Sequence, residues 1–364
     1  MAVLEMQHRV DAVIEAFAQG EIVVVTDDDD RENEGDLIVA AVHATPEKMA
    51  FIIRHTCGIV CAPLTSEIAQ RLRLSPMVSD NDSPHGTAFT VSVDYRHGTS
   101  TGISADDRTA TVRNLANGNA GAVDFVRPGH IFPLIAKDGG VLMRSGHTEA
   151  AVDLCRLAKL EPVAAICELV NDDGTVMRGR DVTGFASRHG IKRVSVADLI
   201  AYRQAREKLV DRVGEFPVST EIGTLQGYAY VTPFDKVHHM AFVYGRIGDG
   251  ENVLARLHRA DVIGDVFEGA KPIQAALHRF KREGRGVIIY LRDGTAGVPI
   301  TAIPHEKDGP EAARTRQWRE IGLGAQILKD LGISSIRILT STQRTYVGLA
   351  GFGIEIVSTE AIDG

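Results

Sequence analysis

The sequence predicts an α/β protein with two domains, each a mixed sheet with flanking helices. Apolar runs and amphipathic segments alternate along the chain, which is the pattern of strands and helices that pack in layers. The chain has 364 residues and is 44% hydrophobic, which is enough for two separate cores. A charged helical segment at 196–210 ends before Gly214 and Pro217. This break places the boundary near residue 208 and predicts domains at 1–208 and 209–364.

The elements of the first domain follow from local patterns, in chain order. Apolar residues at helical spacing predict a helix at 7–19, and Gly20 ends it. Thr45 and Thr65 precede two further helices, because a threonine oxygen can accept the free amide hydrogens of a helix start. A polar loop at 97–108 leads into helical periodicity. The other predicted elements are strands at 21–26, 37–42, 58–62, 88–93 and 163–170 and helices at 147–160 and 196–210.

The second domain continues the alternation, and the chain shows neither an internal repeat nor a low-complexity segment. Its predicted strands lie at 225–231, 240–245, 286–291, 336–340 and 354–357, and its predicted helix lies at 317–331.

Charge and hydropathy exclude several classes of protein. The formal net charge of -8 argues against a nucleic-acid partner, because phosphate binding needs a concentrated basic excess. The first eight residues lack the basic and apolar regions of a signal peptide, and no apolar run approaches the length of a membrane span. We therefore expect a cytoplasmic protein without a membrane partner.

The four cysteines favour reduced, packed thiols. Cys57, Cys61, Cys155 and Cys167 all have apolar neighbours. A zinc site built from Cys57 and Cys61 would need two further ligands at zinc-like spacing, and none follows.

The segment 27–36 (DDDDRENEGD) holds seven carboxylates and one arginine between two apolar runs. Such a run can be nothing more than a solvated face. Here its charges are concentrated in one short loop between strands, together with Arg31 and Gly35. This arrangement favours a site for a divalent cation or a polar substrate.

The segment 144–149 (RSGHTE) has the features of an anion site at a helix start. Gly146 lets the backbone approach a ligand, Thr148 can cap the following helix, and Arg144 adds positive charge to the free amide groups. His147 lies at the mouth of this predicted site.

Two further residues can take part in proton transfer. His130 follows Arg127, Pro128 and Gly129 at a predicted turn, where it could also be an ordinary surface residue. Glu168 lies in an otherwise apolar strand, where burial predicts a raised pKa or else a structural ion pair. With the acidic loop and the anion site, these groups suggest metal-assisted chemistry on a phosphorylated, hydroxylated small molecule.

Five motifs within about the first 205 residues resemble those of 3,4-dihydroxy-2-butanone 4-phosphate synthase, and they occur in that family's order. They are residues 30–36 (DRENEGD), 55–58 (HTCG), 99–104 (TSTGIS), 127–130 (RPGH) and 144–149 (RSGHTE).

The resemblance implies an enzyme of riboflavin biosynthesis, a homodimeric lyase that converts ribulose 5-phosphate into formate and a four-carbon phosphate. It implies two Mg²⁺ or Mn²⁺ ions per subunit, with Glu32 and His147 at metal-binding positions. His130 and Glu168 match residues essential for activity. The positions that match substrate-binding residues are Arg31, Glu32, Asp36, Arg144, Ser145, Gly146, His147, Thr148 and Glu168. The resemblance assigns no role to Asp27 or to Glu34.

Residues from about 210 onward resemble GTP cyclohydrolase II but lack its zinc ligands. That family holds zinc with three cysteines, whereas Asp261 stands at the first of these positions and no cysteine follows Cys167. Gln317 stands where the family has a catalytic aspartate, although Arg319 matches the family's arginine. We therefore expect no zinc and an inactive second domain. The alternatives are a bifunctional enzyme, or a second domain that regulates the first or mediates dimerisation.

Overall fold

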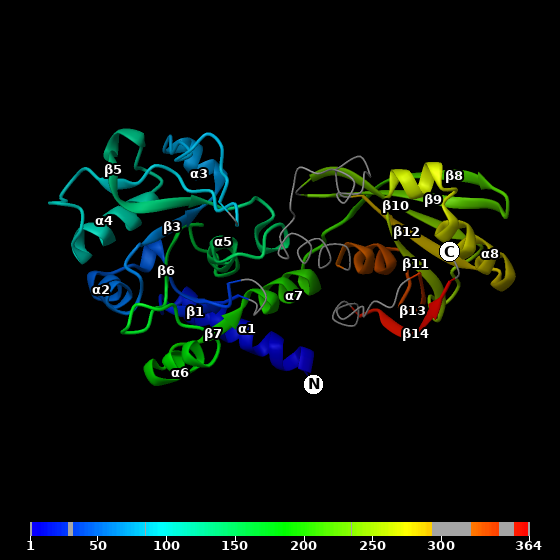
Figure 1. The fold of residues 1–364 in the computed structure, drawn as a ribbon, viewed down its shortest axis with the longest axis horizontal. Coiled ribbons are helices and arrows are strands. Elements are labelled where there is room, and N and C mark those ends of the chain that lie inside the picture. The colour runs from blue at the N-terminus through cyan, green and yellow to red at the C-terminus, as the bar shows by residue number, and fades with distance from the viewer. Residues whose placement is uncertain are drawn as a thin grey trace. The chain divides into compact units, whose positions relative to one another are not determined.

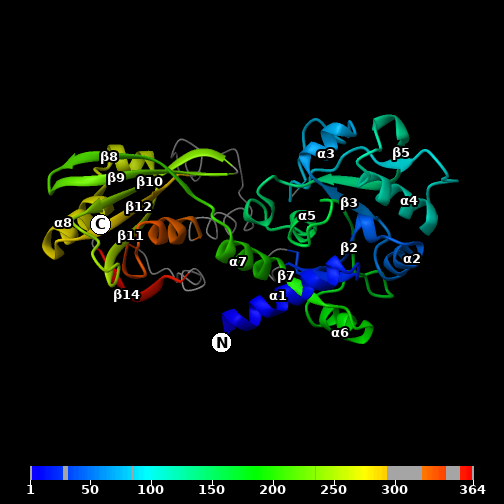
Figure 2. The ribbon, with the colours of Figure 1, turned by 180° about the vertical axis from the view of Figure 1, so that it is seen from behind.

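The computed structural model describes residues 2–27, 32–83, 85–233, 235–292, 322–341 and 353–362 (Figures 1 and 2). The chain divides between Tyr202 and Arg203 into two compact units. Each unit contains a mixed sheet of seven strands with helices, which confirms the predicted α/β class. The boundary at residue 208 stays a prediction. No helix among the described residues is both long and apolar enough to cross a membrane.

The first unit is built on a sheet with the strand order β4-β5-β3-β6-β2-β1-β7. Its strands are β1 (Val23–Thr26), β2 (Gly35–Ala40), β3 (Cys61–Leu64), β4 (Val93–Tyr95), β5 (Phe125–Ile135), β6 (Ala164–Glu168) and β7 (Arg193–Ser195). Its helices are α1 (Ala2–Ala18), α2 (Pro46–His55), α3 (Ser66–Arg71), α4 (Ala105–Leu115), α5 (His147–Leu157), α6 (Arg180–His189) and α7 (Val196–Arg206), with short helical turns at Ala41–His43, Ala122–Asp124 and Gly140–Leu142.

Alternation along the strands gives this sheet two buried faces. Leu37 and Val39 of β2 join a core with residues of α2, α4 and α6. The intervening residue of β2, Ile38, is also fully buried, and α1 and α5 both contact β1 and β2. The segments that precede helices behave as predicted, because Thr45 and Thr65 each accept an amide hydrogen and cap α2 and α3.

The predicted turn at 127–130 is wrong, since these residues lie inside the 11-residue strand β5. The reason is a bulge in its pairing with β4. Val93 pairs with Ile131 while Asp94 pairs with Val126, so the four residues 127–130 have no partner on β4. A strand can therefore contain Pro128 without losing a ladder hydrogen bond. Most of the predicted strand at 88–93 lies outside β4, and Phe89 and Thr90 form only isolated bridges, with Leu134 and Pro76.

The second unit has a sheet with the order β14-β13-β11-β12-β10-β9-β8. Its strands are β8 (Asp211–Thr220), β9 (Gly223–Thr232), β10 (Asp235–Tyr244), β11 (Val253–Arg259), β12 (Gly286–Leu291), β13 (Ser335–Thr340) and β14 (Glu355–Ala361). Besides these it contains a π-helical turn at Ile263–Phe267, the helix α8 (Lys271–Glu283) and a helix over 322–330. Strands β11 to β14 are parallel to their neighbours in this set, whereas β10, β9 and β8 pair antiparallel.

Sequence patterns missed β7, β8, β11, α6 and α8. Strand β8 was hidden by Gly214 and Pro217, which strands tolerate at a sheet edge. The beginning of the predicted helix at 317–331 and the segment 293–321, with Gln317 and Arg319, lie outside the described residues.

Candidate active site

Asp27, the first residue of the acidic loop at 27–36, holds the far side of that loop through its carboxylate. Its carboxylate oxygens accept the backbone amide hydrogens of Glu32 at 3.0 Å and of Glu34 at 2.8 Å. Strand β2 begins directly after this turn, at Gly35. Glu32 is thereby held beside the sheet. Arg31 lies outside the described residues.

Glu32, Asp36 and His147 come together although they are far apart in the sequence. His147 is the first residue of α5, and its Nδ1 lies 3.8 Å from Oε2 of Glu32 and 3.9 Å from Oδ1 of Asp36. Ligand atoms of Asp27, Glu32 and His147 all lie within 4.8 Å of one another. Two carboxylates and one imidazole are a donor set that suits Mg²⁺ or Mn²⁺.

Asp36 adds a buried oxygen to this cluster. Its carboxyl group is 2% exposed, and within the described chain no hydrogen bond reaches Oδ1. Burial raises the pKa of Asp36 well above its usual range, and the nearby carboxylates of Glu168 and Glu32 raise it further. A cation beside these groups would offset both effects, so the residues present fit a hard divalent ion.

Sheet register aligns Asp36, Glu168 and His130. Phe132, Cys61, Ile166 and Ile38 form one row across β5, β3, β6 and β2. Two residues further along each strand in the same direction stand His130, Glu168 and Asp36, and Asp36 pairs directly with Glu168. His130 is two strand spacings from Glu168, on the order of 10 Å. The two predicted catalytic residues therefore line one end of the same sheet.

His130 is fixed by a residue that the sequence did not single out, Asp94 of β4. The backbone N–H of His130 donates to Oδ1 of Asp94 at 2.8 Å, and its Nδ1 lies 2.7 Å from Oδ2. The bulge brings Gly129 so close to β4 that an added Cβ would lie 2.1 Å from the carbonyl carbon of Val93. Only glycine fits there, which explains the motif around His130.

The start of α5 differs in detail from the predicted anion site. Gly146 is the N-cap residue and no side chain caps the helix, so the predicted capping role of Thr148 is wrong. The helix begins at His147, which makes Thr148 its second residue and leaves its hydroxyl past the capping position. Ser145 and Gly146 immediately precede α5, as the motif requires.

Arg144 links the start of α5 to the segment 85–87. Its guanidinium donates to Oε2 of Glu149 at 2.6 Å, twice to the backbone carbonyl of His85, and to the hydroxyl of Thr87. Burial raises the pKa of Glu149, and the charge of Arg144 opposes this shift. The imidazole of His85 in turn lies 3.6 Å from Oε1 of Glu32.

Glu168 makes no ion pair within the described residues, and its predicted role stays a prediction. Its Oε2 accepts a hydrogen bond from the thiol of Cys57 at 2.9 Å. Asp27 and Asp94 are the acidic residues that sequence patterns missed. Asp27 was one of several carboxylates in a run, and Asp94 gave only a weak signal as an acid between the apolar residues Val93 and Tyr95.

Comparison with known proteins shows the family of the chain. Residues 11–202 match the family model of 3,4-dihydroxy-2-butanone 4-phosphate synthase, which is more than half of the chain. The chain belongs to this family. It is a lyase of riboflavin biosynthesis, and its second part, residues 211–361, matches the family model of GTP cyclohydrolase II.

Relatives of this synthase share one or both of its units. The riboflavin biosynthesis protein RibBA of Bacillus mycoides is 44% identical over 96% of this chain and 92% of its own length. The crystal structure of RibBX from A. baumannii, a two-domain 3,4-dihydroxy-2-butanone 4-phosphate synthase, is 36% identical, with a TM-score of 0.81 over 96% of this chain and 99% of that one. A 3,4-dihydroxy-2-butanone 4-phosphate synthase solved with two magnesium ions is 48% identical, with a TM-score of 0.53, and covers 54% of this chain and 97% of its own.

The second unit of the synthase has a buried polar network at the carboxyl end of β11. His258 lies 2.8 Å from Oδ1 of Asp265, and the hydroxyl of Tyr290 donates to Oδ2 of Asp265 at 2.6 Å. Asp261 stands where the resemblance would place a zinc thiolate, and its carboxylate instead accepts the amide hydrogens of Ile263 and Gly264. Within the described residues, the side chains around His258 are therefore engaged in hydrogen bonds to one another and to the backbone.

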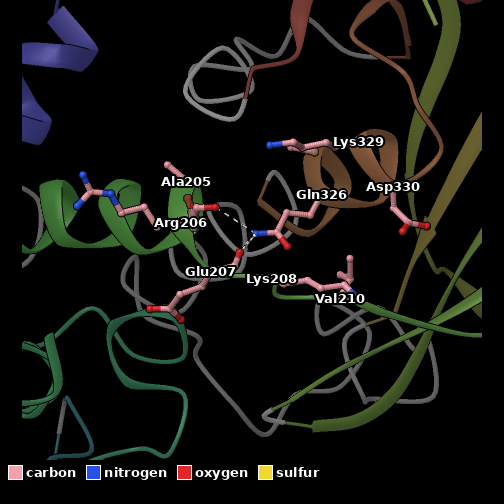
Figure 3. A pocket seen from close by; sticks show the side chains of 10 residues that line it. Ala205, Arg206, Glu207, Lys208, Val210, Gln326, Lys329 and Asp330 are labelled. Atoms are coloured by element: carbon pink, nitrogen blue, oxygen red, sulfur yellow. Dashed lines mark hydrogen bonds between the residues drawn. The ribbon is translucent and has the colours of Figure 1, made fainter. Parts of the chain in front are cut away.

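A cavity of about 320 Å³ lies elsewhere in the second unit of the synthase (Figure 3). The second unit begins at Arg203, within the last turn of α7. The lining residues all follow this point and are Gln204, Ala205, Arg206, Glu207, Lys208, Val210, Ala325, Gln326, Lys329 and Asp330. The side-chain amide of Gln326 donates to the backbone carbonyl groups of Gln204 at 3.1 Å and of Glu207 at 2.7 Å. Figure 3 labels Gln326 and Glu207 and marks hydrogen bonds with dashed lines. The acids of its wall are paired, Glu207 with Arg203 and Asp330 with Arg212. The cavity shares no residue with the candidate active site.

Proposed function

We propose that the first unit converts D-ribulose 5-phosphate into formate and 3,4-dihydroxy-2-butanone 4-phosphate. The observation that carries this proposal is the cluster of Glu32, Asp36 and His147, with Glu168 beside Asp36 in the sheet. Deprotonation at carbon, loss of water, a skeletal shift and release of formate require several proton transfers at one site. A cluster of carboxylates and imidazoles in different environments meets that requirement.

Glu32 and His147 would hold Mg²⁺ or Mn²⁺, with Asp27 within reach of the same ion. When bound, the cation supplies positive charge that stabilises negative charge developing on the sugar oxygens. The two magnesium ions in the solved relative support two ions per subunit here. Glu168 and Asp36 would hold and move protons, and His130, oriented by Asp94, would present Nε2 to the substrate.

The substrate would be bound by Arg31, Asp36 and residues 144–148. The amide groups at the start of α5 can hold a phosphate, because a helix start combines free N–H groups with the positive end of the helix dipole. We further propose a homodimer located in the cytoplasm.

The second unit, we propose, has no GTP cyclohydrolase activity. The support is compositional, because no cysteine follows Cys167 and a thiolate-bound zinc therefore cannot form in this unit. An inert or structural role is the first choice. The alternatives are a bifunctional enzyme and a regulatory or dimerising module.

One assay separates these possibilities. The purified full chain is incubated with ribulose 5-phosphate or with GTP, each with Mg²⁺ or Zn²⁺, and formate is measured. Formate is expected only from ribulose 5-phosphate with Mg²⁺. Zinc-dependent release of formate from GTP would establish the bifunctional alternative.

Variants assign the reaction to the cluster. Glu32→Ala and His147→Ala are expected to abolish formate release without unfolding the protein, while His97→Ala, an exposed histidine of the same unit, keeps wild-type turnover. Normal turnover in either cluster variant would reject the assignment.

A further inference from the structure

Two cysteines and one carboxylate converge beside the proposed metal site. The Sγ atoms of Cys57 and Cys167 lie 3.5 Å apart, and Sγ of Cys57 lies 2.9 Å from Oε2 of Glu168. One ligand atom from each of these residues lies within 4.8 Å of the other two. Both thiols are reduced in the structure.

The sheet creates this cluster, not a local sequence motif. The amide of Cys57 donates to the carbonyl of Glu168 at 2.9 Å, and Thr56 forms a bridge with Leu169. The segment after α2 therefore pairs with the chain at the end of β6. Gly58, with φ of +81°, then turns the chain away. Cys57 is thereby left at the strand end next to Cys167, which is 110 positions away. Cys61, at zinc-like spacing from Cys57, takes no part.

We propose that Cys57, Cys167 and Glu168 form a binding site for one thiophilic divalent cation of the Zn²⁺ class. Zinc accepts two thiolates and a carboxylate, with water in the fourth position of a tetrahedron. Zn–S bonds of about 2.3 Å place two sulfurs roughly 3.8 Å apart in that geometry, close to the separation seen here. Binding replaces the two thiol protons, which pass to the solvent.

Access and ligand chemistry distinguish this site from the first. Cys57 is exposed, which gives an ion an entry path, whereas Cys167 is buried behind it. Sulfur ligands select Zn²⁺ over Mg²⁺, while the carboxylates and imidazole of Asp27, Glu32 and His147 suit the hard ions. Zn²⁺ would therefore occupy a site next to, and different from, the site of the Mg²⁺ or Mn²⁺ ions.

The site shares Glu168 with the proposed reaction, so occupancy inhibits the synthase. This consequence rests on the proposed function, because it requires Glu168 to take part in turnover. Zinc binding itself does not depend on it.

Cobalt is a direct probe, because Co²⁺ bound by thiolates absorbs in the near ultraviolet and Zn²⁺ displaces it. The reduced full chain is titrated with Co²⁺ in excess Mg²⁺. We expect one thiolate-bound Co²⁺ per chain in the wild type and in Cys155→Ser, a control at a buried thiol whose partner is the carbonyl of Val163. In Cys57→Ser the absorption is lost and Zn²⁺ binds at least about 100-fold more weakly, since even loss of an outer partner can cost that much. A wild type without the band, or a Cys57→Ser variant that keeps it, overturns the proposal.

Inhibition is measured on the same proteins with saturating Mg²⁺. The concentration of Zn²⁺ that halves formate release is expected to rise at least about 100-fold in Cys57→Ser and to stay unchanged in Cys155→Ser. Equal sensitivity of all three proteins rejects the inhibitory role. If the wild type releases no formate at all, the proposed function fails, and the cobalt titration still decides the binding site.

Discussion

Single residues in the active site depend on partners that lie far away in the sequence. The motifs singled out Glu32, His147 and His130, and an otherwise apolar strand singled out Glu168. The structure brings Glu32 and His147 within 3.8 Å. Asp94 could not be recognised, because the bulge that brings it to His130, 36 positions away, is a property of the β4–β5 pairing. A sequence pattern shows which amino acid occupies position 94, whereas the role of Asp94 depends on the register between β4 and β5.

Asp94→Asn is expected to lower kcat by about 10²-fold with little change in KM. A neutral amide is a weaker acceptor for Nδ1 of His130 than a carboxylate, so the imidazole loses its orientation. Steady-state kinetics that separate kcat from KM check this.

The matched control for this variant is Asp124→Asn. Asp124 lies 2.8 Å from the His97 ring, close to the 2.7 Å between Asp94 and the His130 ring, but His97 is 57% exposed. The turnover of the Asp124→Asn variant should equal that of the wild type. A loss of kcat as large as that of Asp94→Asn would show that removal of any such carboxylate harms the fold, and would remove the positioning role of Asp94.

At the scale of elements, caps and amphipathic patterns were enough to predict α1, α2 and α3, because these signals are local. Residues 127–130 of β5 were predicted as a turn, because Pro128 and Gly129 are typical turn residues and fit this strand only where its pairing with β4 is interrupted. Arg144 shows the same limit, because its ties to Glu149 and to the segment 85–87 join elements that no local pattern relates.

Arg144→Met is expected to destabilise the first unit by about 3 kcal/mol, because it leaves Glu149 buried without its cation. The double variant Arg144→Met/Glu149→Gln should recover most of this loss. Hydrogen exchange of the amides of α5 in the full chain measures both effects.

The two variants should nevertheless share a raised KM for ribulose 5-phosphate, since both lose the anchors of His85 and Thr87. A double variant that is as unstable as the single one would contradict the importance of the buried pair. Wild-type KM in both would show that the segment 85–87 does not need Arg144.

The whole molecule combines two units with similar sheets and different chemistry. The first unit has a cluster of acids and imidazoles at the candidate active site. In the second unit the polar side chains around His258 are engaged in hydrogen bonds, such as that of His258 with Asp265. The alternation along the chain predicted both sheets, but strand order could not be predicted, because it depends on pairings such as β1 with β7.

The stability of the second unit should fall as the pH drops. His239 of β10 is 1% exposed, and burial, followed by the charges of Arg292 and His238, lowers its pKa to about 4. Below an unfolded pKa of about 6.5 the unfolded chain binds a proton that the folded chain does not. Stability is therefore complete above about pH 6.5 and decreases by up to about 3 kcal/mol as the pH falls to 4.

Hydrogen exchange of β10 and β12 at pH 5 and pH 7 tests this sign. In His239→Asn the amide oxygen can still accept the N–H of Arg292, which the ring accepts at 3.2 Å, but the side chain does not titrate. This variant should lose less protection at pH 5 than the wild type. The exposed neighbour His238→Asn serves as the control, and equal acid sensitivity of all three proteins would contradict the prediction.

A chain of residues 1–208 should keep synthase activity within a few-fold. The solved relative with two magnesium ions is itself a chain that aligns with only 54% of this one. Formate release and thermal unfolding of the truncated protein are compared with those of the full chain. A large loss of either would favour the regulatory or dimerising alternative for the second unit.

The pairing of β1 with β7 also constrains the order in which the first unit can form on the ribosome. Residues 24–26 pair with residues 193–195, so the sheet lacks its last strand until almost the entire unit has been synthesised. Until then β1 is an open edge whose free N–H and C=O groups can pair with other strands. Slower synthesis up to about residue 195 therefore lengthens the time during which this edge is open to wrong pairing.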